Sequence, residues 1–196
     1  MRIGRQILER TFILRSVTLI ILLIAGSAYA QEIRVDGTVV GFGGRAAGVS
    51  RPFRLIVNHL TSAGEASELT QTLGSGGDDA LVKALSHMNA GRITVGNGVG
   101  LRANAVIADR WENGGTRLTV FYERNVSFYE LRAGSRSSDY KIGYAEIFLD
   151  SRGHGSGTFI PAARVRLKNG NTWEVEDFGV YPAKLMGLRS TGPLLR

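Results

Sequence analysis

The sequence predicts a mainly β domain of the α+β class, an antiparallel barrel or sandwich of about eight strands with a two-helix insertion between strands 2 and 3. Short apolar runs with strand-like alternation recur along most of the chain, and many of the 26 glycines among its 196 residues lie in the turns between them. Helical periodicity is confined to residues 62–89. Barrels and sandwiches share this pattern, so the sequence leaves the choice between them open.

The first two strands are predicted at residues 32–42 and 53–57. Apolar side chains recur along the first strand, and Gly37 in its middle is a candidate bulge. Pro52 bounds the second strand. Because a glycine-rich turn at residues 43–48 lies between the two runs, we expect them to pair.

Two short helices are expected next. Ser62 and Glu65 have the spacing of a capping box, and the apolar residues that follow share one helical face as far as Gly74. The second helix, residues 78–89, begins with two aspartates, which suit the positive end of a helix dipole. Its predicted apolar face comprises Leu81, Leu85 and Met88. The pair of helices should cover one end or one face of the sheet.

The rest of the chain reads as antiparallel sheet. Six further strand-like runs are predicted, at residues 92–95, 101–110, 116–124, 141–149, 157–167 and 172–180. The glycine-rich connections between most of them are typical of hairpins.

The last of these hairpins has a predictable register. A two-residue loop would set Arg166 opposite Trp173 and so bring charge onto the apolar face. A three-residue loop, residues 169–171, sets Arg166 opposite Glu174 and Leu167 opposite Trp173. One face of the hairpin then carries the charged side chains and the other the apolar ones, so we expect the three-residue loop.

Residues 1–30 have the order of a cleavable export signal. Four arginines precede an uncharged run that is shorter than a membrane span, and the small residues Ala28 and Ala30 fit the positions before a cleavage site. We therefore expect a single β-rich domain, residues 31–196, that is soluble after cleavage and works in the periplasm or is secreted.

Composition narrows the possible functions. The chain has no cysteine, which excludes disulfides, thiolate metal sites and a cysteine nucleophile. Its formal charge of +7 falls to about +4 without the four arginines and one glutamate of the first thirty residues. No block of like charges occurs, and nucleic acid is not an expected partner.

No motif predicts a metal, a cofactor or a catalytic residue. His59, His87 and His154 are too far apart in the sequence to form a recognisable metal-ligand motif, and none of the glycine clusters has the strand, loop and helix context of a nucleotide-binding turn. No serine has the flanking glycines of a nucleophile elbow. Two carboxylate pairs could in principle act together in a groove, Glu123 with Glu130 and Glu146 with Asp150.

The most distinctive stretch runs from Phe121 to Tyr144, where aromatic residues and cations alternate around a loop rich in glycine, serine and arginine. Such a loop could stack on a sugar ring or bind an anionic group. The alternative is a purely structural interpretation, in which Tyr122 and Tyr144 are core residues and the arginines are solvated. The candidate ligand-binding residues are Arg124, Tyr129, Arg132, Arg136 and Tyr140.

The segment from Gly143 to Pro182 carries a resemblance. Its turn at residues 153–158, the run Ile160-Pro161-Ala162-Ala163 and the pair Phe178-Gly179 resemble a recurring pattern in uncharacterised exported bacterial proteins. The resemblance extends over most of residues 31–196 and implies a bacterial, extracytoplasmic setting. It implies no activity and no functional residue.

The expected function is that of a non-catalytic exported binding or structural domain, whose partner could be an envelope polysaccharide or an amphiphile. One alternative is a barrel that holds a small ligand in an interior cavity lined by residues such as Ile107, Val120 and Phe159. Another is a hydrolase acting on an envelope polymer, which would need two carboxylates facing each other in an open groove.

Overall fold

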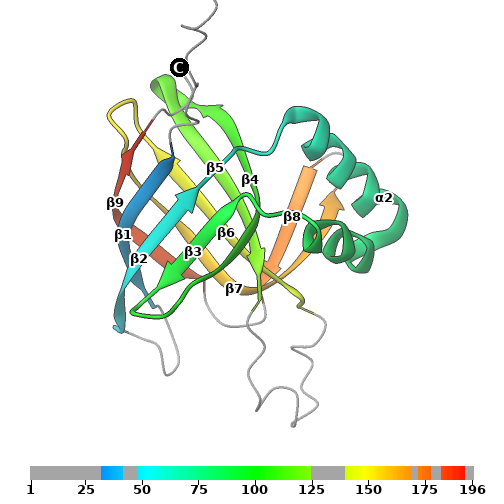
Figure 1. Ribbon diagram of the computed structural model, residues 1–196, viewed down its shortest axis with the longest axis horizontal. Helices are drawn as coiled ribbons and strands as arrows, with labels where there is room; N and C mark the ends of the chain where they lie inside the picture. The colour runs from blue at the N-terminus through cyan, green and yellow to red at the C-terminus, as the bar shows by residue number, and fades with distance from the viewer. Residues whose placement is uncertain (1–31, 42–47, 125–139, 169–171, 178–181, 193–196) are drawn as a thin grey trace, which may run out of the picture. The chain divides into compact units, whose positions relative to one another are not determined.

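A computed structural model shows a closed antiparallel β-barrel with one long helix on its outer wall (Figure 1). The structure describes residues 32–41, 48–124, 140–168, 172–177 and 182–192. The predicted export signal lies outside these ranges and stays a prediction. Among the described helices, none combines the length and the apolar character needed to cross a membrane.

Among the described residues, nine strands form one sheet in the order β6-β5-β4-β3-β2-β1-β9-β7-β8, and pairing of β6 with β7 closes it into a ring of eight. The strands are β1 (Ile33–Val40), β2 (Ser50–Val57), β3 (Gly91–Val95), β4 (Leu101–Trp111), β5 (Gly115–Glu123), β6 (Ile142–Leu149), β7 (His154–Lys168), β8 (Thr172–Asp177) and β9 (Ala183–Thr191). All pairings are antiparallel. The prediction of a barrel or a sandwich is therefore resolved as a barrel.

The strand that completes the ring is β9, which the sequence did not reveal. It pairs with β1 on one side and with the first half of β7 on the other, while β8 pairs only with the outer half of β7. Strand alternation in β9 is broken at Gly187, which has a positive φ of 59° and adds one residue opposite Gly37. The bulge expected at Gly37 is present, but the extra residue belongs to β9. This irregularity hides the strand, because Leu185 and Leu188 both face inward at a spacing of three.

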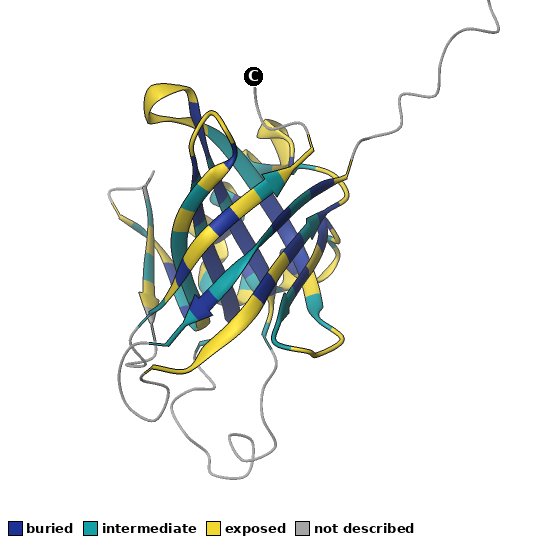
Figure 2. Ribbon diagram, turned by 90° about the vertical axis from the view of Figure 1, so that its left-hand side faces the viewer, coloured by how far each residue is buried: buried dark blue, intermediate teal, exposed yellow. Residues whose placement is uncertain are grey.

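The interior of the barrel is a core of buried apolar side chains. The strands of the ring place alternate side chains inside except at the bulges in β4 and β9, and Figure 2 shows buried and exposed residues alternating along the wall. An eight-stranded barrel is just wide enough for its own side chains to fill it. Fully buried members include Val35, Leu55, Val106, Val120 and Leu185.

The insertion after β2 is one helix, α2 (Ala63–Ser86), and the expectation of two helices is wrong. The capping box is present, because Ser62 Oγ accepts from the Glu65 amide at 3.3 Å and the Glu65 carboxylate accepts from the Ser62 amide at 2.8 Å. Only Gly77 departs from helical geometry, with φ 68° and ψ −163°. The Gly74 to Gly77 region, which in the sequence suggested a helix end, is a kink within α2.

A second core lies between α2 and the outer wall of the barrel. Both expected apolar faces of the helix are used, because Leu69 and Leu73 before the kink and Leu81 and Leu85 after it are all buried. They pack on outward-facing residues of β4, β5, β6 and β7, which include Phe121 and Tyr144. The kink lets both halves of α2 follow the curved wall.

The hairpin of β7 and β8 has the predicted register. Arg166 pairs with Glu174, and Leu167 pairs with Trp173, so Lys168 and Thr172 enclose a three-residue loop. The apolar side chains of the hairpin face the second core. On the edge of β7 away from β8, the Val165 amide donates to the Asp78 carboxylate at 3.4 Å, just after the kink of α2. The helix therefore covers an edge that would otherwise be open.

Replacing Trp173 with alanine is expected to lower the free energy of unfolding by about 2 to 3 kcal/mol, because its half-buried indole packs on Phe121 with ring centroids 5.0 Å apart. Glu174→Ala, the adjacent exposed position, should cost about 1 kcal/mol or less. Urea denaturation of both variants checks this ranking. A larger cost for Glu174→Ala would contradict the assignment of faces.

Candidate functional site

One end of the barrel holds a pocket of about 350 Å³ beside the hairpin between β3 and β4. Its lining comprises Ile93, Val95, Leu101, Tyr122, Phe159, Pro161 and residues 98–100 of the hairpin. None of these described residues carries a charge at neutral pH. We call this pocket the barrel mouth. Its volume and apolar lining fall within the range of small-molecule sites.

Two stacked rings line the inner side of the barrel mouth. Tyr122 from β5 and Phe159 from β7 lie 5.4 Å apart between centroids with an interplanar angle of 12°, and Phe53 meets Phe159 edge-on at 6.4 Å. The Tyr122 hydroxyl donates to the Ile160 carbonyl at 3.0 Å. Burial raises the pKa of Tyr122 well above its ordinary value, so the group stays a neutral phenol. The aromatic wall of the pocket is therefore uncharged, and its one hydroxyl group already has a hydrogen-bond partner in the protein.

The hairpin at residues 96–100 forms the rim of the barrel mouth with little side-chain bulk. Gly96 and Gly100 have positive φ angles of 74° and 83°, so the turn favours glycine at both ends. At Gly98 an added Cβ would meet no atom within 4 Å. The large side chain of the rim, Val99, is 87% exposed. From the sequence, this glycine cluster could be compared only with nucleotide-binding turns, and it lacks the helix that follows the loop in such a turn.

The three residues expected to line an interior cavity are divided by the structure. Phe159 lines the barrel mouth, and Val120 is fully buried in the interior core. Ile107 lies on the outside of the wall and packs towards α2. A bulge in β4 between Ala103 and Ala105 shifts the alternation, which explains why the inward face of this strand could not be assigned from the sequence.

The described residues of the predicted ligand-binding segment connect strands to one another. The Arg124 guanidinium donates to the Tyr140 carbonyl at 2.7 Å, and the Tyr140 hydroxyl donates to the Glu176 carboxylate at 2.9 Å. The bond to Glu176 also raises the pKa of Tyr140. Lys141 forms an ion pair with Asp79 of α2. Arg124 and Tyr140 are thus brought together, whereas Tyr129, Arg132 and Arg136 lie outside the described residues.

Tyr122 and Tyr144, at the ends of the same stretch, are buried core residues, as the purely structural interpretation of this stretch predicted.

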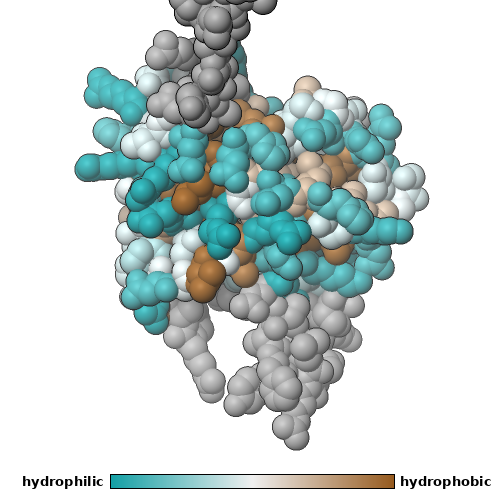
Figure 3. Space-filling model, in the orientation of Figure 1, coloured by the Kyte–Doolittle hydropathy of each residue, from teal (hydrophilic) through white to brown (hydrophobic). Residues whose placement is uncertain are grey.

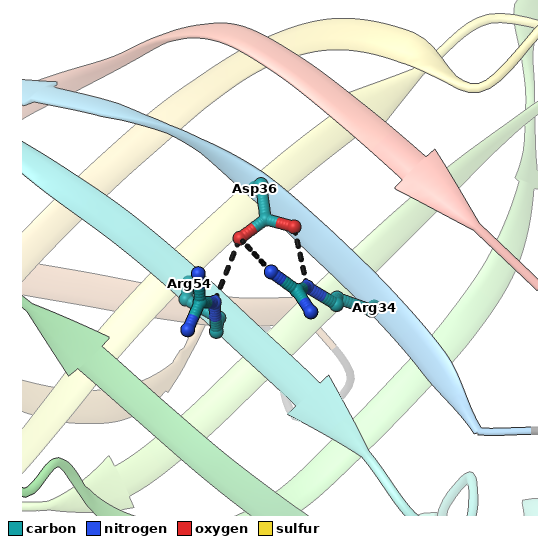
Figure 4. A network of polar contacts seen from close by, with 3 residues as sticks. All are labelled: Arg34, Asp36 and Arg54. Carbon is teal, nitrogen blue, oxygen red and sulfur yellow. Dashed lines mark hydrogen bonds and ion pairs between the residues drawn. The ribbon is translucent and has the colours of Figure 1, made fainter.

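A separate polar cluster lies on the outside of β1 and β2. Figure 4 shows the Asp36 carboxylate between Arg34 and Arg54, with Nε to oxygen distances of 2.5 and 2.8 Å. Burial acts to raise the pKa of Asp36, but the hydrogen bonds from the two arginines outweigh it and lower the pKa. All three side chains are at least 41% exposed, so we interpret the cluster as a surface link between neighbouring strands.

Of the two carboxylate pairs named from the sequence, Glu146 and Asp150 do not converge within the described residues. Glu146 faces the outer wall of the barrel, while Asp150 accepts from the backbone amides of Arg152 and His154 in the turn before β7. Glu130 lies outside the described residues. His59 and His87 lie near opposite ends of α2, and across the described parts of the chain no group of acidic or histidine side chains could hold a metal ion.

Comparison with known proteins leaves the site to be interpreted from its own geometry. No family model matches the chain. Neither the curated proteins nor the solved structures contain a match.

Proposed function

We propose that this domain binds a small apolar or amphiphilic molecule in the barrel mouth and has no catalytic role there. The observation that carries the proposal is the uncharged pocket of about 350 Å³ at the end of a closed barrel. Barrel mouths are a common location of ligand sites. Together with the export predicted from residues 1–30, the proposal describes a ligand-binding domain that works outside the cytoplasm.

The chemistry of the lining supports an apolar ligand. Its side chains are aliphatic or aromatic, and the Tyr122 hydroxyl is already bonded to the chain. Burying a charged group there would leave it without a counter-charge from the lining. A ligand with an apolar body and a polar end could place its body against Tyr122 and Phe159 and leave its polar end at the rim.

The rim supports entry from this end of the barrel. Val99 on the hairpin of β3 and β4, and Val49 just before β2, are 87% and 41% exposed, and both lie at the end where the barrel mouth opens. By contrast, the face shown in Figure 3 is mainly hydrophilic with small separate apolar areas. That distribution favours a small molecule in a pocket over a broad apolar protein interface on that face.

Val95→Phe tests the proposal, because the added ring should occupy the barrel mouth from the end of β3. We expect the wild-type protein to bind the apolar dye N-phenyl-1-naphthylamine with enhanced fluorescence, and decanoic acid to displace the dye. In Val95→Phe the affinity for the dye should fall at least tenfold. Thermal unfolding should confirm that the variant remains folded.

Val49→Phe is the matched control, since it adds the same ring at the same end of the barrel but outside the pocket lining. Its affinity for the dye should equal that of the wild type. Absence of dye binding by the wild type, or equal binding by a folded Val95→Phe variant, would overturn the assignment of the barrel mouth.

A further inference from the structure

A second hollow of about 400 Å³ lies outside the barrel, between the first half of α2 and the wall formed by β4, β5 and β6. We call it the α2 groove and define it by Thr70, Arg117, Thr119, Tyr144, Glu146 and Trp173. These residues come from the helix, two barrel strands and β8, which lie on one side of the barrel (Figure 1). The barrel mouth shares none of its lining residues with this groove.

Aromatic rings form one side of the α2 groove. Phe121 is fully buried behind it, with its ring centroid 5.7 Å from that of Tyr144 and 5.0 Å from that of Trp173. The Trp173 side chain is only partly buried and lines the groove. Its position is therefore held by a rigid neighbour while part of the indole remains available to an apolar ligand surface.

Polar groups line the strand side of the groove. Thr119 on β5 pairs with Glu146 on β6, so both side chains project from the same outer face. Burial and the nearby Glu146 charge raise the pKa of Tyr144 far above its ordinary value, although Arg117 and a hydrogen bond with Thr119 oppose the rise. The Tyr144 hydroxyl consequently keeps its proton at neutral pH, and Glu146 supplies an acceptor beside it.

Arg117 supplies the positive charge among the described residues that line the groove. Its Nη2 donates to the Asp109 carboxylate at 3.0 Å, and its guanidinium lies 5.7 Å from the centroid of the Trp111 ring. The Nε atom is buried, and no hydrogen-bond partner for it occurs among the described residues. A ligand oxygen cannot reach an atom that has no accessible surface, so Arg117 would contact a ligand through the rest of its side chain, which is 36% exposed.

We propose that the α2 groove binds a neutral saccharide. A sugar has an apolar ring face for Trp173 and hydroxyl groups that both donate and accept, which suit the Glu146 carboxylate and the Arg117 guanidinium. Asp109, Glu146 and Arg117 together carry one net negative charge, which disfavours a phosphate or a carboxylate ligand. An organic cation would suit Glu146 and the rings but offers no acceptor to Arg117.

The test measures binding of maltose, cellobiose and N,N′-diacetylchitobiose to the full-length protein by calorimetry at millimolar sugar. At least one of the three should bind. Glu146→Gln removes the charge with little change of shape, and Arg117→Lys keeps the charge beside Asp109 but replaces the forked guanidinium donors with a single ammonium group. Each should weaken binding of that sugar at least tenfold. Glu112→Gln, an exposed position outside the groove, is the matched control and should bind like the wild type.

Dye binding at the barrel mouth separates the two proposals, because Glu146→Gln should leave the affinity for N-phenyl-1-naphthylamine unchanged. Loss of both activities in Glu146→Gln would indicate unfolding, which circular dichroism of the same sample detects, and Arg117→Lys would then decide. Failure of all three sugars to bind would overturn the saccharide assignment. So would undiminished sugar binding by both folded variants, or binding of tetramethylammonium in place of the sugars.

Discussion

Phe121→Ala is expected to lower the free energy of unfolding by about 3 to 5 kcal/mol. The side chain has no exposed surface and lies where α2, β8 and the outer wall of the barrel meet. Its truncation would leave a cavity that Tyr144 and Trp173 border, and the barrel wall behind it is too rigid to collapse into the space. Urea denaturation measures the loss.

Phe148→Ala is the matched control for this variant. Phe148 also points outward, from the neighbouring strand β6, but it is only partly buried. Its ring centroid lies 4.7 Å from that of the exposed Trp111. Its truncation should cost less than half as much. If both variants lost the same stability, the second core beneath α2 would not be the well-packed unit described above.

Gly155→Ala is expected to destabilise the barrel by about 3 kcal/mol or more, because a Cβ at this position would lie 1.7 Å from the Phe148 carbonyl oxygen and 3.0 Å from the Leu149 Cα. These are backbone atoms of the paired strand β6. On its other side Gly155 pairs with Leu188 of β9, so β7 cannot move away without breaking a ladder. The thermal midpoint and the urea midpoint should both fall.

Gly98→Ala provides the comparison, since an added Cβ there meets no atom within 4 Å and the position has no positive φ. Its stability should stay within about 0.5 kcal/mol of the wild type. Equal stability of Gly155→Ala and Gly98→Ala would show that the close approach of β6 and β7 is not a requirement of the fold.

The candidate sites illustrate the limit of reading function from composition. The coincidence of aromatic and arginine residues between Phe121 and Tyr144 drew attention to one segment of the chain. Within its described part, Arg124 and Tyr140 donate hydrogen bonds to other groups of the protein, and Tyr122 and Tyr144 are buried. Both pockets that carry proposals combine residues from distant strands, and no short segment contains their chemistry. Of the residues that the sequence named as the lining of an interior cavity, only Phe159 lines the barrel mouth.

Features that depend on neighbours in the chain could be determined from the sequence by itself. The capping box at Ser62 and Glu65 and the faces of α2 follow from helical periodicity. The register of the β7 and β8 hairpin follows from keeping charge off one face, and the pairing of Arg166 with Glu174 confirms it. These features need no information about where the elements meet.

Closure of the sheet was decided only by the tertiary structure. Whether eight strands form a barrel or a sandwich depends on β9, which pairs with β7 on one side and, on the other, with β1 at the opposite end of the chain. The bulge at Gly187 concealed β9, and the kink at Gly77 made one helix resemble two. In each case a single glycine interrupts the local period while long-range packing continues across it. Local patterns therefore specified most of the elements, and contacts between distant strands specified the ring and the pockets that it encloses and supports.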